Sequence, residues 1–140
     1  MTTIAFKNGV LAADTRWSDE GRSDDYSPKI WRVGKVLIGA CGSRSAAAKF
    51  RQWVLDGMNG NSPYEGNPIG NGMLVAPGGK VVCWCGDGPW PVVSMPFYAL
   101  GSGTHYAQGA MAAGATAEEA VRIASRYDQA TGGELTVLHL

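Results

Sequence analysis

The chain has 140 residues, with twelve basic and twelve acidic side chains and a formal net charge of zero. This length is typical of one domain, residues 1–140, and it allows a sizeable core without disulfides or metals. The balanced charge gives no support for a nucleic-acid partner or an anionic membrane surface.

The sequence contains no run of about 18 apolar residues and no basic segment followed by an apolar one, so we expect neither a membrane span nor a secretory signal. Its three cysteines form no disulfide framework, which indicates reduced thiols and a cytoplasmic protein. Cys83 and Cys85 lack the second pair of ligands that tetrahedral zinc sites use, so we expect core packing and no metal or cofactor.

The N-terminal half predicts two strand pairs and a helix. Asn8-Gly9 between two strand-like runs is a strong hairpin signal, and its register places Asp14 beside Thr2. Small and apolar residues at helical spacing follow Gly42-Ser43. The expected elements are strands 2–7 and 10–14, a loop over 17–27, strands 29–33 and 36–40, and a helix over 45–56.

The C-terminal half begins with a long segment rich in Gly, Asn and Pro that we expect to be a loop. Thr116 and Glu119 form a capping box at the start of a helix. The expected elements are a loop over 59–71, strands 73–76, 80–85 and 98–100, helices 105–113 and 116–127, and a strand over 135–140. Paired strands with three helices between them favour an α+β fold, in which helices cover two sheets.

Thr2 carries the most distinctive potential chemistry. We expect removal of Met1, which would leave one residue with both a hydroxyl nucleophile and an α-amino base. An α-amino group has a pKa of roughly 7.7–8.0, so part of it is basic near neutral pH. The alternative is that Thr2 is simply the first residue of a strand.

Several segments together resemble proteasome-type peptidases, meaning proteasome β subunits and the related bacterial ring peptidase. The similar segments are Thr2-Thr3, Gly9 to Arg16, Lys29-Ile30, Gly39 to Ser43, Leu100 to Gly103 with Tyr106-Ala107, and Tyr127 to Gly133. The resemblance implies a four-layer α/β/β/α sandwich of the N-terminal-nucleophile hydrolase type. Residues 59–71 stand where the family has a second long helix, so we expect that helix to be absent.

The resemblance also implies a set of catalytic residues. Thr2 would be the nucleophile, Lys29 would lower the pKa of its amine, and Asp14 would hold Lys29. Gly42 would supply an oxyanion-hole N–H. The full set implied is Thr2, Asp14, Lys29, Gly42, Ser102, Asp128 and Thr131, the last three around the terminal amine. Asp14 and Lys29 could equally be a structural ion pair, and Gly42 a helix-entry glycine.

The residues implied near the first substrate pocket are Ser18, Ser27, Trp31, Ala40 and Arg44. Arg44 would favour acidic side chains there, unless it pairs with an acid of segment 19–25. The implied activity is that of a threonine-type endopeptidase on peptides or unfolded proteins, within a homo-oligomeric ring and with a possible ATP-dependent unfoldase. An inactive scaffold protein and a small-molecule amidase of the same fold are the alternatives.

Overall fold

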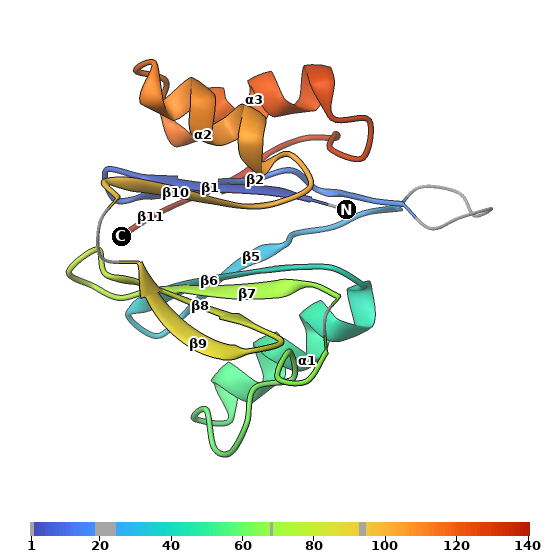
Figure 1. Ribbon diagram of the computed structural model, residues 1–140, viewed down its shortest axis with the longest axis vertical. Helices are drawn as coiled ribbons and strands as arrows, with labels where there is room; N and C mark the ends of the chain where they lie inside the picture. The colour runs from blue at the N-terminus through green and yellow to red at the C-terminus, as the bar shows by residue number, and fades with distance from the viewer. Residues whose placement is uncertain (1, 19–24, 68, 93–94) are drawn as a thin grey trace.

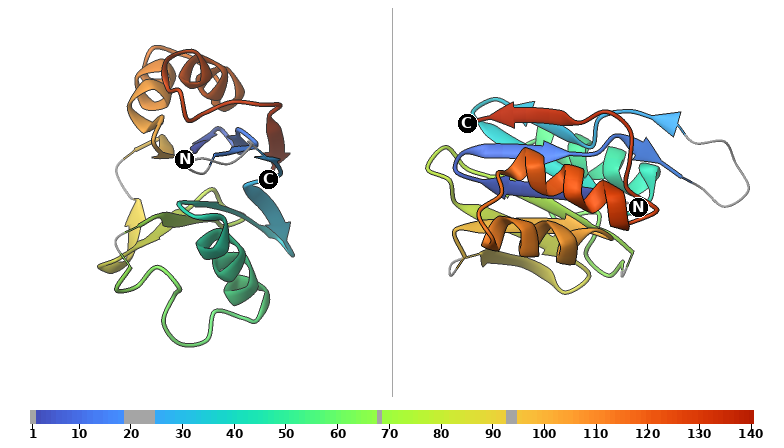
Figure 2. Two further views of the ribbon diagram at one scale, coloured as in Figure 1. Left: turned by 90° about the vertical axis from the view of Figure 1, so that its right-hand side faces the viewer. Right: turned by 90° about the horizontal axis from the view of Figure 1, so that it is seen from above.

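The computed structural model describes residues 2–18, 25–67, 69–92 and 95–140, and they form four layers. Two antiparallel sheets lie face to face, with helices α2 and α3 over one and α1 over the other (Figure 1). The view from above shows α2 and α3 side by side on their sheet (Figure 2). The expected α/β/β/α sandwich is therefore confirmed.

The first sheet has the strand order β10-β1-β2-β11 and begins with the expected hairpin. Asn8 and Gly9 form its two-residue turn with φ of 52° and 76°, the positive values that such a turn requires. Lys7 pairs with Val10 as expected, so Asp14 lies beside the chain start. The strands are β1 (Thr3–Lys7), β2 (Val10–Ala13), β10 (Phe97–Gly101) and β11 (Thr136–His139).

The second sheet has the order β5-β6-β7-β8-β9. Its strands are β5 (Ile30–Val33), β6 (Val36–Cys41), β7 (Asn71–Val75), β8 (Val81–Cys85) and β9 (Gly88–Val92). A separate short ribbon pairs β3 (Arg16–Trp17) with β4 (Asp25–Tyr26). The expectation of a loop over 17–27 was thus wrong at Trp17 and at Asp25–Tyr26, which lie in these strands. Residues 19–24 lie outside the described part.

The helices begin at capping residues that the sequence marks. Helix α1 (Arg44–Leu55) is capped by the Ser43 hydroxyl, and α2 (Thr104–Ala112) follows Gly103. Helix α3 (Ala117–Tyr127) opens with the expected capping box, in which Thr116 and Glu119 bond reciprocally. None of these described helices is long and apolar enough to cross a membrane.

Three buried clusters fill the three spaces between the four layers. Between the sheets, large aliphatic side chains such as Ile4, Leu37 and Met73 are fully buried. Under α1 the cluster is aromatic, with Phe50 packed so closely on β7 that a Cβ at Gly72 would lie 2.4 Å from its ring. Under α2 and α3 the cluster consists mostly of alanines, whose small size lets the helices approach the sheet closely.

Candidate active site

Thr2 lies at the inner end of a cleft of about 610 Å³ where the two sheets meet. The cleft is also lined by Gly42, at the end of β6, and by Ser102, just after β10. Thr2 is fully buried, and its hydroxyl has no hydrogen-bond partner among the described residues. A buried hydroxyl without a partner costs about 1–3 kcal/mol, so this placement is unfavourable for stability alone.

A buried ion pair lies next to the chain start. Both oxygens of Asp14 accept hydrogen bonds from the Lys29 ammonium, at 3.1 and 3.0 Å. Asp14 also accepts from the backbone N–H of Thr3 at 3.0 Å and of Gly132 at 3.1 Å. The carboxylate therefore joins β1, Lys29 just before β5, and the turn before β11, which fixes three segments far apart in the sequence.

Lys29 has no exposed surface, which is rare for a lysine. Besides Asp14, its ammonium donates to the backbone carbonyl of Arg16 and lies 5.0 Å from the ring centre of Trp17. Burial lowers the pKa of Lys29 below its ordinary value, whereas the Asp14 carboxylate opposes this shift. The environment therefore holds a cation in a fixed position without the shielding that water gives at the surface.

A chain of hydroxyl and carboxylate groups lies on the other side of the chain start. The Thr3 and Thr131 hydroxyls are 2.7 Å apart, and Thr131 donates to Asp128 at 2.6 Å. Ser102 donates to the same Asp128 oxygen at 2.5 Å, and its own oxygen is 3.4 Å from the Thr2 carbonyl. These bonds join the cleft wall to the end of α3.

The pKa of Asp128 reflects two opposing effects. Partial burial acts to raise it, but hydrogen bonds from Ser102, Thr131 and the Ala130 N–H outweigh burial, so the pKa is lowered. The group therefore stays an anion over a wider pH range than a free carboxylate. It can orient hydroxyls or attract an ammonium group at the chain start.

Gly42 connects β6 to α1 with a φ of 108°, a conformation that other L-residues rarely adopt. A Cβ at this position would lie 2.8 Å from the Cα of Gly70. Both the backbone conformation at this position and the close packing against Gly70 therefore favour glycine.

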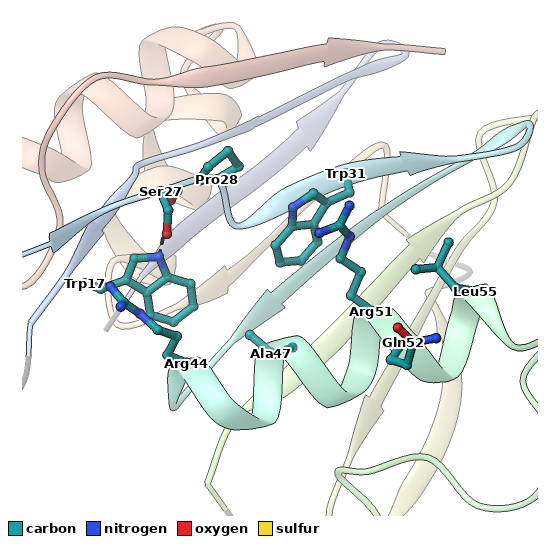
Figure 3. A pocket seen from close by; sticks show the side chains of 10 residues that line it. Trp17, Ser27, Pro28, Trp31, Arg44, Ala47, Arg51, Gln52 and Leu55 are labelled. Carbon is teal, nitrogen blue, oxygen red and sulfur yellow. Dashed lines mark hydrogen bonds between the residues drawn. The ribbon is translucent and has the colours of Figure 1, made fainter.

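A second pocket, of about 270 Å³, lies between β5 and the exposed face of α1 (Figure 3). Its walls include Trp17, whose indole N–H donates to the Ser27 carbonyl, and Trp31. The guanidinium of Arg44 lies 5.7 Å from the ring centre of Trp17, and that of Arg51 lies 5.2 Å from the ring centre of Trp31. Two cations thus lie over two aromatic rings at the rim of one pocket.

Arg44 pairs with an acid of segment 19–25, which was the alternative considered from the sequence. It lines this pocket, and it pairs with Asp25 on β4 at 2.5 Å in an exposed position. Arg51 forms no ion pair with any acid in the described part of the chain. Arg51 was missed in the sequence, although its position two helical turns after Arg44 places it on the same face.

The structure brings most of the expected site residues together. Thr2, Gly42 and Ser102 line the cleft. Asp128 and Thr131 are connected to it through Ser102. The Asp14–Lys29 pair is connected to the neighbouring Thr3 N–H. Ser27, Trp31 and Arg44 line the second pocket. Ala40 does not, because its side chain is fully buried in the cluster under α1, and half-buried Ser18 is also absent from the described pocket wall.

No family model matches the sequence, and no curated protein matches it. Solved structures do match the fold. The Anbu (Gly-1) mutant from Hyphomicrobium sp. strain MC1 superposes with a TM-score of 0.75 at 13% identity, covering 100% of this chain and 82% of its own. Eukaryotic HslV from Trypanosoma brucei and BPH from Thiobacillus denitrificans each reach 0.67, at 18% and 20% identity. The match to HslV covers 99% of this chain and 99% of HslV, and the match to BPH covers 99% of this chain and 96% of BPH.

These neighbours have the proteasome-type fold of the N-terminal-nucleophile hydrolases, and this chain shares it over nearly its full length. The resemblance seen in the sequence motifs is therefore confirmed at the level of the fold.

Proposed function

We propose that this protein is a threonine-type peptidase whose nucleophile is the hydroxyl of Thr2 after removal of Met1. The observation that carries the proposal is the shared cleft of Thr2, Gly42 and Ser102, with the buried Asp14–Lys29 pair beside the chain start. A nucleophile, an oxyanion donor and a fixed cation are the groups that acyl transfer needs.

In the proposed reaction, the Thr2 hydroxyl attacks the carbonyl carbon of a peptide bond while its own α-amine takes the proton. The Gly42 N–H stabilises the oxyanion that forms. The tetrahedral intermediate collapses, the leaving amine takes the proton from the α-ammonium, and an ester joins Thr2 to the acyl half of the substrate. Water then hydrolyses this ester in the same manner, which regenerates Thr2.

The other residues tune the terminal amine. The positive charge of Lys29 would lower the pKa of the Thr2 amine and keep it neutral. The anionic Asp128 and the hydroxyls of Ser102 and Thr131 would orient that amine by hydrogen bonds. We further propose that the pocket of Trp17, Trp31 and Arg44 receives the side chain that precedes the cleaved bond.

We also propose that the peptidase acts in the cytoplasm as a homo-oligomeric ring, with peptides or unfolded proteins as substrates. The proteasome-type fold and the free cysteines at positions 41, 83 and 85 support this assignment. An ATP-dependent unfoldase is a possible supplier of substrate to such a ring, and it belongs to the same proposal.

Cleavage of fluorogenic peptides by protein lacking Met1 tests the proposal. Thr2→Ala is expected to abolish turnover and to keep the fold, because it removes the hydroxyl together with one methyl group, and that hydroxyl has no hydrogen-bond partner among the described residues. Thr2→Ser keeps a hydroxyl and should retain part of the rate. Full activity of Thr2→Ala would rule out the mechanism.

A further inference from the structure

Tyr64 is the largest side chain in the structure with no exposed surface, and it comes from the long loop between α1 and β7. Its ring packs against Phe50 of α1, with the ring centres 5.4 Å apart. Its hydroxyl donates to the backbone carbonyl of Cys41 at 2.9 Å. The loop that stands in place of a helix therefore sends a rigid aromatic side chain to the end of β6.

The carbonyl that Tyr64 binds belongs to the same peptide group as the N–H of Gly42. Among the described residues no peptide bond is cis, and in a trans peptide the C=O and N–H point in opposite directions. Fixing the Cys41 carbonyl on the side of Tyr64 thus directs the Gly42 N–H away from the loop. Cys41, Gly42 and Thr2 all line the cleft.

The loop is shaped to bring Tyr64 to this place. Gly70 passes so close to β6 that a Cβ there would lie 2.4 Å from the Cys41 oxygen and 2.9 Å from the Tyr64 ring. The Tyr64 N–H donates to the Ser62 hydroxyl at 3.1 Å, and the Gly66 N–H donates to the Gly86 carbonyl at 3.0 Å. The loop is thereby tied to itself and to the turn between β8 and β9.

We propose that Tyr64 is a positioning residue for peptide hydrolysis, whose hydroxyl holds the Cys41–Gly42 peptide group so that the Gly42 N–H meets the substrate oxyanion. This inference rests on the proposed function for the identity of the reaction. Hydrogen bonding to the carbonyl also polarises the peptide, which strengthens its N–H as a donor. Burial raises the pKa of Tyr64, so the hydroxyl remains a donor throughout the range of neutral pH.

The kinetic test is Tyr64→Phe, which removes one oxygen and keeps the ring. Removing an oxyanion-hole donor lowers kcat by a factor of about 10²–10³. A Gly42 N–H that is present but less firmly positioned should therefore lower kcat by roughly tenfold. KM should stay within about twofold, because the ground-state carbonyl depends little on this donor. A peptide aldehyde, which forms a tetrahedral adduct, should lose affinity in proportion to the loss of kcat/KM.

A control variant and a stability measurement separate positioning from loss of the fold. Tyr106→Phe removes the hydroxyl of an exposed tyrosine on α2 and should retain kcat. Ser62→Ala removes the acceptor of the Tyr64 N–H but leaves the Tyr64 hydroxyl, so it should lower kcat less than Tyr64→Phe does. The melting temperature of every variant is compared with that of the wild type. A Tyr64→Phe protein that keeps wild-type kcat and aldehyde affinity would overturn the proposal.

A spectroscopic measurement tests the geometry without reference to turnover. With ¹⁵N-glycine labelling, the Gly42 amide signal should shift in Tyr64→Phe and stay in place in Tyr106→Phe. If Tyr64→Phe does not fold, 3-fluorotyrosine at position 64 keeps the shape, alters the donor strength and should shift the same signal. If the Gly42 signal does not move in Tyr64→Phe, the role of Tyr64 is refuted. If the signal moves but the wild-type protein does not cleave peptides, only the peptidase function is refuted.

Discussion

The contacts of the Lys29 ammonium are the most informative feature of the candidate site. A full ammonium group is enclosed by a carboxylate, a backbone carbonyl and an indole ring, with no exposed surface. Removing one partner of such a buried pair is strongly destabilising, whereas the pair itself is only weak evidence for a stabilising role. The proposed mechanism needs a positive charge beside the chain start, and Lys29 supplies one.

Lys29→Arg tests this explanation because it keeps the charge and changes the shape. A planar guanidinium is broader than an ammonium and cannot occupy the same enclosed space without moving Asp14 or Trp17. We expect a loss of peptidase rate of more than tenfold. Lys7→Arg is the matched control, since Lys7 also donates to two backbone carbonyls, near α2 and α3. A rate within a few-fold of wild type would contradict a catalytic role for Lys29.

The two arginines over the second pocket predict a preference for an acidic side chain before the cleaved bond. We expect peptides to be cleaved in the order Glu, Leu, Lys at that position. Arg51→Ala should lower the ratio of Glu to Lys cleavage by about two- to fivefold, the range of exposed ion pairs. Arg44→Ala should lower it less, because Arg44 already pairs with Asp25. Arg122→Ala on α3 is the control, as Arg122 pairs with Glu118 in an exposed position. An unchanged ranking in both pocket variants would remove the pocket assignment.

Helices and strands could be predicted from the sequence where a short motif is compatible with only one local structure. Asn8-Gly9 fixed the first hairpin and its register, and the Thr116 capping box fixed the start of α3. Strand β9 was missed because Pro89 and Pro91 argue against a strand. Both lie on the edge of the sheet, where a residue without an N–H is tolerated.

The candidate site was predictable to the extent that its residues follow motifs along the chain. The glycines and the Asp14–Lys29 pair belong to such motifs. Tyr64 and Arg51 do not, because their roles arise from a loop folding back on β6 and from the packing of α1 beside β5. Contacts between segments that are distant in sequence produce no local sequence motif, so they could not be predicted.

The end of α3 carries a prediction for pH dependence. The pKa of Asp128 is lower in the folded protein than its ordinary value, so its contribution to stability is present above about pH 4 and is lost as the pH falls through the lowered pKa. Asp128→Asn should therefore lower the melting temperature at pH 7, and the difference from wild type should shrink below about pH 4. Exposed Asp87→Asn is the control. A difference that stays constant from pH 7 to pH 3 would contradict this linkage.

At the scale of the whole molecule, the surface around the end of α1 bears on assembly. Leu55 and Met58 are each at least 40% exposed there. In the family that the sequence resembles, a second long helix stands in this region and contributes to packing between rings. The described residues between α1 and β7 form no such helix, while the sandwich itself is retained.

We expect the protein to form a ring without this helix, because a lone monomer would expose its active site to every surrounding protein. Light scattering at micromolar concentration should give a mass several times the 14.7 kDa of one chain. Leu55→Glu and Met58→Glu, changed together, test whether this apolar face contributes to the assembly. A strictly monomeric wild-type protein would favour the amidase alternative over a ring peptidase.

The central claim is that Thr2 becomes a reactive N-terminal nucleophile, and mass spectrometry after reaction with a peptide β-lactone tests it most directly. Attack of the Thr2 hydroxyl on the lactone carbonyl opens the ring and leaves an ester, so the intact lactone mass is added. We expect protein that lacks Met1 to gain one such mass, located on Thr2 by fragmentation and absent from Thr2→Ala. Retention of Met1 in protein from the native source, or a failure of protein lacking Met1 to gain the adduct on Thr2, would contradict the account.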